Sequence, residues 1–191
     1  LSYPMLHPDT KRATGTNGVL HFFNVPVLYT PAFALPTTSD RRSGFLAPTY
    51  GYASRGNWSG WDITAPYYMN IAPNRDMTLY PRYLGNRGVQ MGTEFRYLDR
   101  QYSGMFNAEV LPNDSVTNTN RWSFGLKHNQ IVQPGMVAYT DYSRVSDNSY
   151  VDDLGRSLTG GVNRQFNQEA GVRYVTGPWS VLTRVQQFQT L

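Results

Sequence analysis

The amino-acid sequence predicts an all-β protein whose larger part consists of about eight antiparallel strands of a transmembrane β-barrel. From Trp58 onward, apolar and polar residues alternate at period two in segments of about ten residues, separated by turn residues. In membrane barrels such alternation places one strand face against lipid and the other toward the lumen. The composition agrees, because charged residues make up only 16% of the chain and aromatic residues 14%, whereas soluble domains carry about 25% charged residues.

The segment Gly88–Leu98 has the clearest alternation, with apolar side chains on one face and polar side chains on the other. The apolar face holds Val89, Met91, Phe95 and Tyr97, and the polar face holds Gln90, Gly92, Glu94 and Arg96. The other predicted strands are Trp58–Tyr68, Arg75–Leu84, Gln101–Leu111, Asn120–Asn129, Gly135–Val145, Asn167–Thr176 and Trp179–Gln189. Eight strands is also the smallest number that closes a transmembrane barrel.

The connections between these strands fall into two classes. Gly85–Arg87, Asp99–Arg100 and Gly177–Pro178 are tight, whereas Pro112–Thr119 and Ser146–Phe166 are long and polar. Outer-membrane barrels have short periplasmic turns and longer extracellular loops. The two lengths therefore favour a barrel of the outer-membrane type.

The longest connection carries three acidic residues, Asp147, Asp152 and Asp153. A calcium site is one interpretation, because carboxylate oxygens are the ligands that Ca²⁺ prefers. Their spacing matches no EF-hand register, so a solvated acidic loop is the favoured interpretation and no metal site is predicted.

The first 57 residues have a different pattern. No charged side chain lies between Arg12 and Asp40, and Val19–Thr30 is apolar on both faces, which predicts a strand buried on both sides. Pro26, Pro31 and Pro36 would interrupt its hydrogen bonding, so the strand is expected at a sheet edge or with a bulge. Residues 37–57 are rich in Ser, Gly and Arg and have no periodicity, which predicts a connection that contains a domain boundary.

Composition also excludes several classes of function. The chain has no cysteine, so a disulfide, a thiolate metal site and a thiol nucleophile are all excluded. It has 17 basic residues, dispersed and almost all arginine, rather than the clustered Lys and Arg of a nucleic-acid surface. No apolar run reaches the roughly 18 residues of a membrane-spanning helix. Because the chain starts at Leu1 without a signal peptide and stops inside an amphipathic run, it is expected to be a piece of a longer protein.

Several long motifs carry a resemblance to a known family. They are PVLYTPAFALPTTSDRRSGFLAPTYG (26–51), APYYMNIAPNRDMTLYPRYLGNRGVQMGTEFRYL (65–98), VLPND (110–114), RVSDNSYVDDLG (144–155) and WSVLTRVQQFQTL (179–191). In this order they resemble the LptD family of lipopolysaccharide-assembly outer-membrane proteins, also called organic solvent tolerance proteins. The resemblance covers nearly the whole chain from about residue 18 onward.

The resemblance implies two incomplete domains. Members of the family have a periplasmic β-jellyroll followed by a large barrel. Residues 1–36 are then expected to be the C-terminal part of the jellyroll, 37–57 the connection into the barrel, and 58–191 its N-terminal strands. The implied function is transport of lipopolysaccharide from the jellyroll through a lateral barrel gate into the outer leaflet, without a cofactor. The implied partners are lipopolysaccharide, the plug lipoprotein LptE and the periplasmic bridge protein LptA; the implied location is the cell outer membrane, with the N-terminal segment in the periplasm.

Pro66 and Pro81 are the lateral-gate residues that the resemblance implies. Both lie inside predicted strands, and a proline in a strand cannot donate to the ladder. At a barrel seam each missing N–H would weaken pairing by roughly 0.5–1.5 kcal/mol. The alternative is that both prolines simply mark bulges.

Two further sets of candidates remain open. The apolar strand either serves core packing or lines a lipid groove in the jellyroll; the candidates are Phe22, Phe23, Val25, Val27, Leu28 and Tyr29. Asp40, Arg41 and Arg42 in the connection could bind lipid A phosphates through bidentate contacts, although pinning the connection to lumen residues is slightly favoured.

The charged residues predicted on the lumen face are expected to form ion pairs and hydrogen bonds between strands rather than to bind a ligand. They are Asp76, Arg82, Glu94, Arg96 and Glu109.

Two other functions are alternatives to transport. A lipid hydrolase or deacylase needs a serine nucleophile with a histidine, but the chain has no Gly-x-Ser-x-Gly elbow, and of His7, His21 and His128 only the last lies in a predicted barrel strand, on the outward face. The chain is therefore not expected to be an enzyme. A passive porin or substrate-specific channel shares the strand pattern but would lack the jellyroll-like segment and the gate prolines.

Overall fold

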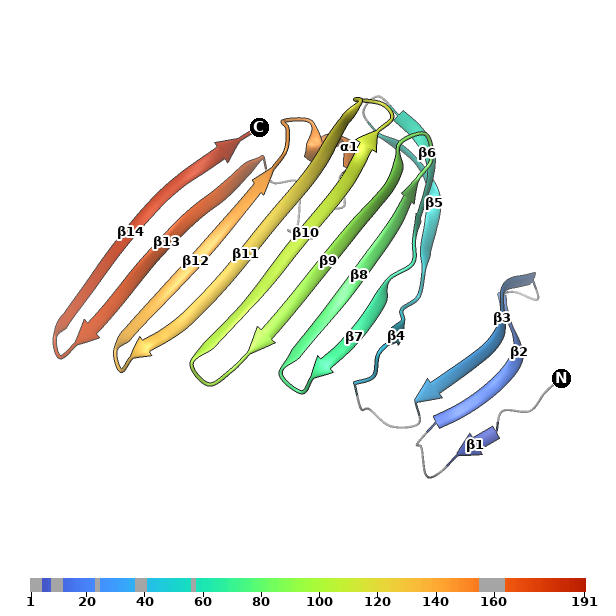
Figure 1. The fold of residues 1–191 in the computed structure, drawn as a ribbon, viewed down its shortest axis with the longest axis horizontal. Coiled ribbons are helices and arrows are strands. Elements are labelled where there is room, and N and C mark those ends of the chain that lie inside the picture. The colour runs from blue at the N-terminus through green and yellow to red at the C-terminus, as the bar shows by residue number, and fades with distance from the viewer. Residues whose placement is uncertain (1–4, 8–11, 23–24, 37–40, 56–57, 155–163) are drawn as a thin grey trace. The chain divides into compact units, whose positions relative to one another are not determined.

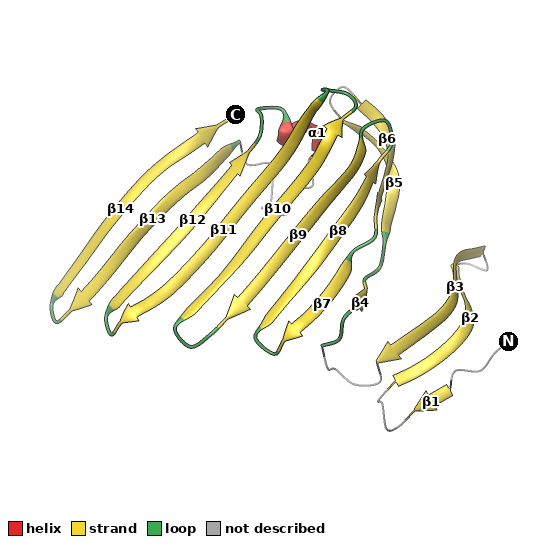
Figure 2. Ribbon diagram, in the orientation of Figure 1, coloured by secondary structure: helices red, strands yellow, loops and turns green. Residues whose placement is uncertain are grey.

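The computed structural model describes residues 5–7, 12–22, 25–36, 41–55, 58–154 and 164–191, and it confirms an all-β fold (Figures 1 and 2). The chain divides into two units, Leu1–Arg42 and Ser43–Leu191. The division falls within the segment 37–57 that the sequence marks as a connection. Among the described residues, no helix has the length and hydropathy needed to cross a membrane.

The first unit is an antiparallel sheet of β1 (Met5–His7), β2 (Arg12–Phe22) and β3 (Val25–Pro36), in that order. The prediction of one strand over Val19–Thr30 is wrong, because this segment spans the end of β2 and the start of β3. Val19 pairs with Tyr29 across the two strands. An apolar run that continues from one strand into the next conceals the reversal of the chain.

The expectation of an edge or bulged strand with three prolines is confirmed for β3. In the described sheet, β3 has a single neighbour, β2. The register between them shifts at Leu20 and His21, and beyond this shift His21 pairs with Pro26. An edge strand and a bulge are the two places where a sheet tolerates proline.

Within its described residues, the second unit is an 11-stranded sheet with one short helix. Its strands are β4 (Gly44–Phe45), β5 (Thr49–Arg55), β6 (Trp58–Thr64), β7 (Tyr67–Ala72), β8 (Arg75–Leu84), β9 (Gly88–Leu98), β10 (Tyr102–Asp114), β11 (Thr119–Gln133), β12 (Met136–Val145), β13 (Gln165–Thr176) and β14 (Trp179–Thr190), and its helix is α1 (Tyr150–Leu154). The spatial order is β14-β13-β12-β11-β10-β9-β8-β6-β5, while β7 continues β6 along β8 and pairs with β4 on its other side. The sheet is open, and it reproduces the predicted meander of neighbouring antiparallel strands (Figure 1).

Two differences from the predicted strands concern the start of this sheet. The predicted strand Trp58–Tyr68 is interrupted at Ala65 and Pro66, so that β6 ends at Thr64 and β7 begins at Tyr67. The segment 37–57, expected to lack periodic structure, contains β4 and β5. The other seven predicted strands are present, and Arg75–Leu84 and Gly88–Leu98 have the predicted bounds.

Successive connections alternate between the two ends of the antiparallel sheet. One end, which we call the short-turn end, holds the turns at 73–74, 99–101, 134–135 and 177–178. The other, the long-loop end, holds the connections 115–118 and 146–164 and also the tight turn 85–87. The first residue of the second unit, Ser43, lies at the short-turn end. Its hydroxyl accepts a hydrogen bond of 2.9 Å from the backbone N–H of Asn70 near the end of β7.

The two faces of the sheet carry the predicted difference in polarity. The outward face exposes large apolar side chains, including Tyr83, Val89, Met91, Val110 and Trp122. The opposite face buries polar ones, including Asp76, Arg82, Gln90, Asn107, Glu109 and Arg121. The sheet curls around α1 on this second, concave face, because α1 contacts strands as far apart as β5 and β11. A small apolar core lies there at the long-loop end; its buried members are Trp58, Leu84, Leu111, Val145, Tyr150, Val151, Leu154 and Phe166.

Candidate functional site

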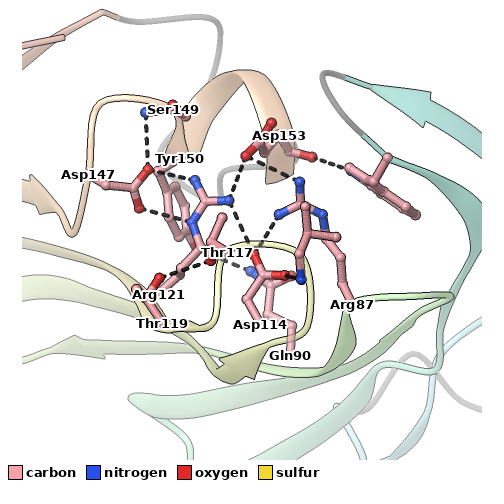
Figure 3. A network of polar contacts seen from close by, with 12 residues as sticks. Arg87, Gln90, Asp114, Thr117, Thr119, Arg121, Asp147, Ser149, Tyr150 and Asp153 are labelled. Carbon is pink, nitrogen blue, oxygen red and sulfur yellow. Dashed lines mark hydrogen bonds and ion pairs between the residues drawn. The ribbon is translucent and has the colours of Figure 1, made fainter.

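A network of two arginines and three aspartates lies between α1 and the concave face (Figure 3). Arg87 comes from the β8–β9 turn, Asp114 ends β10, Arg121 lies near the start of β11, and Asp147 and Asp153 belong to the β12–β13 connection. Three connections from the long-loop end thus converge on one point. This network is possible because alternate connections of an antiparallel meander meet at the same end.

Arg121 is the centre of the network. Its guanidinium is 1% exposed and binds Asp147 in a bidentate manner, with Nε to Oδ2 at 2.9 Å and Nη2 to Oδ1 at 2.6 Å. Its Nη1 donates to Asp153 Oδ2 at 2.6 Å and to Asp114 Oδ2 at 3.4 Å. The guanidinium carbon also lies 5.6 Å from the ring centroid of Tyr150. Planar forked donors suit this role, since they can satisfy several carboxylates at once.

Arg87 is fully buried and shares two of these carboxylates. Its Nη1 donates to Asp114 Oδ2 at 2.6 Å, and its Nη2 lies 3.2 Å from Asp153 Oδ2. The second contact is an ion pair without hydrogen-bond alignment, since Nε and Nη2 have no hydrogen-bond partner among the described residues. The Arg87 guanidinium also lies 5.5 Å from the ring centroid of Trp58, within range of a cation–π interaction.

Tyr150 joins α1 to the middle of the sheet. Its hydroxyl donates to Glu109 Oε2 at 2.7 Å and accepts from Gln90 Nε2 at 3.1 Å. Ser123 donates to the same Glu109 oxygen at 3.1 Å. Burial, followed by the charge of Glu109, raises the pKa of Tyr150. The hydroxyl therefore stays protonated and donates throughout the physiological pH range.

Asp147 is held ionised at the rim of the network. Burial opposes ionisation, but hydrogen bonds from Arg121 and Ser146 outweigh it and lower the pKa of Asp147. Its carboxylate also accepts a hydrogen bond from the backbone N–H of Ser149 at 3.0 Å, which shapes the approach to α1.

The two carbonyls at the end of α1 accept hydrogen bonds from the first strands of the sheet. Trp58 Nε1 in β6 donates to the carbonyl of Asp153 at 3.0 Å. Arg82 Nη1 in β8 donates to the carbonyl of Leu154 at 2.9 Å, while its Nε and Nη2 bind Asp62 in β6 at 2.8 and 2.7 Å. The last carbonyls of a helix lack intrahelical partners, and α1 has no basic residue in its last turn. The strands therefore cap the helix.

The prediction of a solvated acidic loop is wrong for Asp147 and Asp153, because both bind buried arginines. Asp152 is exposed and lies 3.4 Å from Arg164. Within the described ranges, no group of three or more His, Cys, Asp or Glu side chains has an arrangement that could hold a metal ion. Each acidic group of the network faces a guanidinium, so the arrangement fixes structure rather than supplying an acid, a base or a nucleophile.

The predicted interstrand pairs on the concave face are confirmed for Asp76, Arg82, Arg96 and Glu109, whereas Glu94 contacts Arg96 within the same strand β9. Arg96 binds Asp76 through Nε and Nη2 at 2.7 and 3.0 Å, and its Nε lies 3.6 Å from Glu94. Arg82 pairs with Asp62, and Glu109 accepts from Tyr150 and Ser123 as described above.

The structure brings Pro66 and Pro81 to the same level of the sheet, at the interruption between β6 and β7. The carbonyl of Pro81 accepts a hydrogen bond of 3.1 Å from Ala65, and the carbonyl of Pro66 accepts one of 2.9 Å from Leu46. In an antiparallel ladder the N and O of one residue point toward the same neighbour. The ring nitrogen of Pro81 therefore faces the interruption, and that of Pro66 faces the edge beyond β7.

The candidates in the first unit are located by register. Phe22 ends β2 and pairs with Val25, and Leu28 and Tyr29 pair with Leu20 and Val19; Val27 falls where the register shifts. Phe23 and Asp40 lie outside the described residues. Arg41 and Arg42 are the last residues of the first unit.

His128 lies on the outward face, as predicted, where its Nδ1 is 2.6 Å from the hydroxyl of Tyr97. Its described partner is thus an aromatic hydroxyl on the apolar side of the sheet, away from the polar face.

The sequence pattern did not indicate Arg87, Asp114 and Arg121 as a site. One signal was available, since each lies in or directly beside a turn between predicted strands, where a charged side chain can fold over the sheet end. Their meeting depends on the relative register of β8 to β12, which local periodicity does not give.

The fold and its two unlike faces define a segment of a membrane β-barrel with a helix folded against its polar side. The family model described as "LPS transport system D", LptD, matches residues 119–191. Proteins named LPS-assembly protein LptD are similar over 96% of the chain: the one from Ralstonia nicotianae is 54% identical over 183 residues, and the one from Cupriavidus necator 51% identical over 185. The chain belongs to the LptD family. It spans 22% of the length of these two relatives.

Proposed function

We propose that the chain is part of a lipopolysaccharide transport and assembly protein of the bacterial outer membrane. The similarity to proteins named LPS-assembly protein LptD carries this proposal, at 54% identity over 96% of the chain. The open sheet supports it, because a strand set with an apolar outward face and a polar concave face suits part of a large lipid-embedded barrel. No observation favours the alternative of a passive porin.

In this proposal residues 1–36 end a periplasmic jellyroll, 37–57 lead into the barrel, and 58–191 begin it. Lipopolysaccharide would pass from the jellyroll past Asp40, Arg41 and Arg42. The groove candidates in the jellyroll are Phe22, Phe23, Val25, Val27, Leu28 and Tyr29. The family resemblance supplies the partners LptE, as plug, and LptA, as periplasmic bridge. We propose no catalytic step.

The gate would lie beside Pro66 and Pro81. Next to this interruption, β4 pairs with β7 through only two residue pairs, Gly44 with Tyr68 and Phe45 with Tyr67. A short ladder beside two missing donors is the weakest edge that the described part of the second unit offers. We propose that lipid leaves the lumen through this edge.

The test is the double variant Pro66→Ala, Pro81→Ala in the full-length protein. Each alanine restores an N–H, which adds roughly 0.5–1.5 kcal/mol of pairing where an acceptor is present. Surface lipopolysaccharide, measured by labelling intact cells, should fall. Pro134→Ala, in the exposed β11–β12 turn, is the matched control and should leave it unchanged. Unchanged surface lipopolysaccharide in the double variant at normal protein level would remove the gate role.

A further inference from the structure

The segment Ser146–Leu154 binds side chains from across the second unit. Its hydrogen bonds reach Trp58 in β6, Arg82 in β8, Gln90 in β9, Glu109 in β10 and Arg121 in β11. A loop segment that follows β12 is therefore tied to the strands at the start of the sheet.

These hydrogen bonds reach the sheet where the ladder between β6 and β8 is short. The strands β6 and β8 share three residue pairs, Asp62 with Leu84, Ile63 with Tyr83 and Thr64 with Arg82. By contrast, β8 and β9 remain paired along their whole length, from Arg75 with Tyr97 to Leu84 with Gly88. Two further backbone hydrogen bonds flank these pairs, from Gly85 N to the Trp61 carbonyl at 2.7 Å and from Ala65 N to the Pro81 carbonyl at 3.1 Å. Side chains add to this short ladder, namely the Arg82–Asp62 ion pair at 2.7 Å and the bond from Trp58 to α1.

The edge of the sheet beside β8 has two halves, β6 with β5 and β7 with β4, and they are held by different contacts. At the long-loop end, β6 pairs with β5 from Thr49 with Thr64 to Arg55 with Trp58, and it is also bound to α1. At the short-turn end, β7 pairs with β8 over five residue pairs and has the two-residue β4 on its outer side. The hydrogen bonds of Ser146–Leu154 given above go instead to β6, β8, β9, β10 and β11. The interruption at Pro66 separates the two halves.

We propose that Ser146–Leu154 is a latch that holds β6 to the middle of the sheet, so that strand separation at the edge is confined to the half formed by β4 and β7. This inference rests on the proposed gate. In this proposal the segment Ser146–Leu154 sets how far the edge opens. The proline interruption between β6 and β7 is the hinge, and the half that contains β6 stays closed.

The test is hydrogen–deuterium exchange of the full-length protein in lipid nanodiscs, comparing peptides that cover β6 and β7. Tyr150→Phe removes the hydroxyl that binds Glu109 and Gln90, and it keeps the buried ring. Amide exchange in β6 and α1 should become at least about fivefold faster, since about fivefold corresponds to the loss of one hydrogen bond of average strength and the variant removes two. Exchange in β7 should not change.

The matched control is Tyr97→Phe, which removes a hydrogen bond to His128 on the outward face and touches no latch residue. It should leave β6 as in the unaltered protein. Trp58→Phe, which removes the donor to Asp153, is a second latch variant and should repeat the pattern of Tyr150→Phe.

Equal acceleration in β6 and β7 would mean general destabilisation and would overturn the latch, as would unchanged exchange of β6 in both latch variants. Surface lipopolysaccharide in the Pro66 and Pro81 double variant tests the gate separately. If surface lipopolysaccharide is unchanged in the double variant while exchange becomes faster in β6 alone in the latch variants, the latch is structural and the gate is refuted.

Discussion

Replacing Arg121 by methionine tests whether the charged network, rather than apolar packing, holds the latch in place. Arg121 binds three carboxylates and is 1% exposed. Breaking a buried ion pair by removing one partner costs about 3–5 kcal/mol. The lower end of this range applies to Arg121→Met for two reasons. Asp147 is 38% exposed and can be hydrated, and Asp114 and Asp153 remain paired with Arg87.

A cost of about 3 kcal/mol raises the population of the undocked segment more than 100-fold, since about 1.4 kcal/mol is a factor of ten. Hydrogen exchange can measure this, because docking fixes two backbone donors of the segment. Asp153 N donates to the Ser149 carbonyl at 3.0 Å, and Ser149 N donates to Asp147 Oδ1 at 3.0 Å. Both amides should exchange faster by about two orders of magnitude in Arg121→Met.

The control is Arg144→Met on the neighbouring strand β12, where the side chain is exposed. It removes the same charge and should leave both amides protected. If Arg121→Met also left them protected, the network would not hold the segment, and the apolar contacts of Tyr150, Val151 and Leu154 would have to suffice.

Two other predictions concern pH and a close backbone contact. The lowered pKa of Asp147 stabilises docking above the unfolded-state value of about 3.9, and this contribution is lost as the pH falls through the lower folded-state value. Between pH 5 and 2 the thermal midpoint should therefore fall less steeply in Asp147→Asn than in the unaltered protein, and equal slopes would contradict the assignment. A Cβ at Gly60 would lie 2.6 Å from the carbonyl oxygen of Gly85, whereas one at Gly51 would meet nothing within 4 Å. Gly60→Ala should lower the thermal midpoint through a loss of roughly 1–3 kcal/mol, Gly51→Ala should not, and equal midpoints would contradict the close approach.

Periodicity predicted the strands from Arg75 onward because each has one face toward water or polar side chains and one toward an apolar medium. A period-two pattern then fixes both the strand and its orientation. Segment 49–55 has a weaker version of the pattern, with Tyr50 and Tyr52 exposed and the smaller Gly51 and Ala53 alternating with them. It lies in a stretch rich in Gly and Ser, which hid β5.

The helix α1 and its network were beyond sequence reasoning for a physical reason. A helix of five residues is too short to be stable by itself, and YVDDL shows no helical repeat. Its stability comes from Trp58, Arg82 and Arg121, which lie far away in the chain. Only the assembled sheet brings these donors together.

The charged groups under α1 disfavour a shifted register of the strands. A buried ion pair adds little net stability compared with apolar packing, but a buried charge without its partner is strongly unfavourable. A slip of one residue in β11 would turn Arg121 to the outward, apolar face and leave Asp114 and Asp153 with Arg87 alone. Apolar contacts would tolerate such a slip far better, because both faces already carry apolar groups at this end. The network therefore favours one register among several strands whose backbone hydrogen bonds alone would accept others.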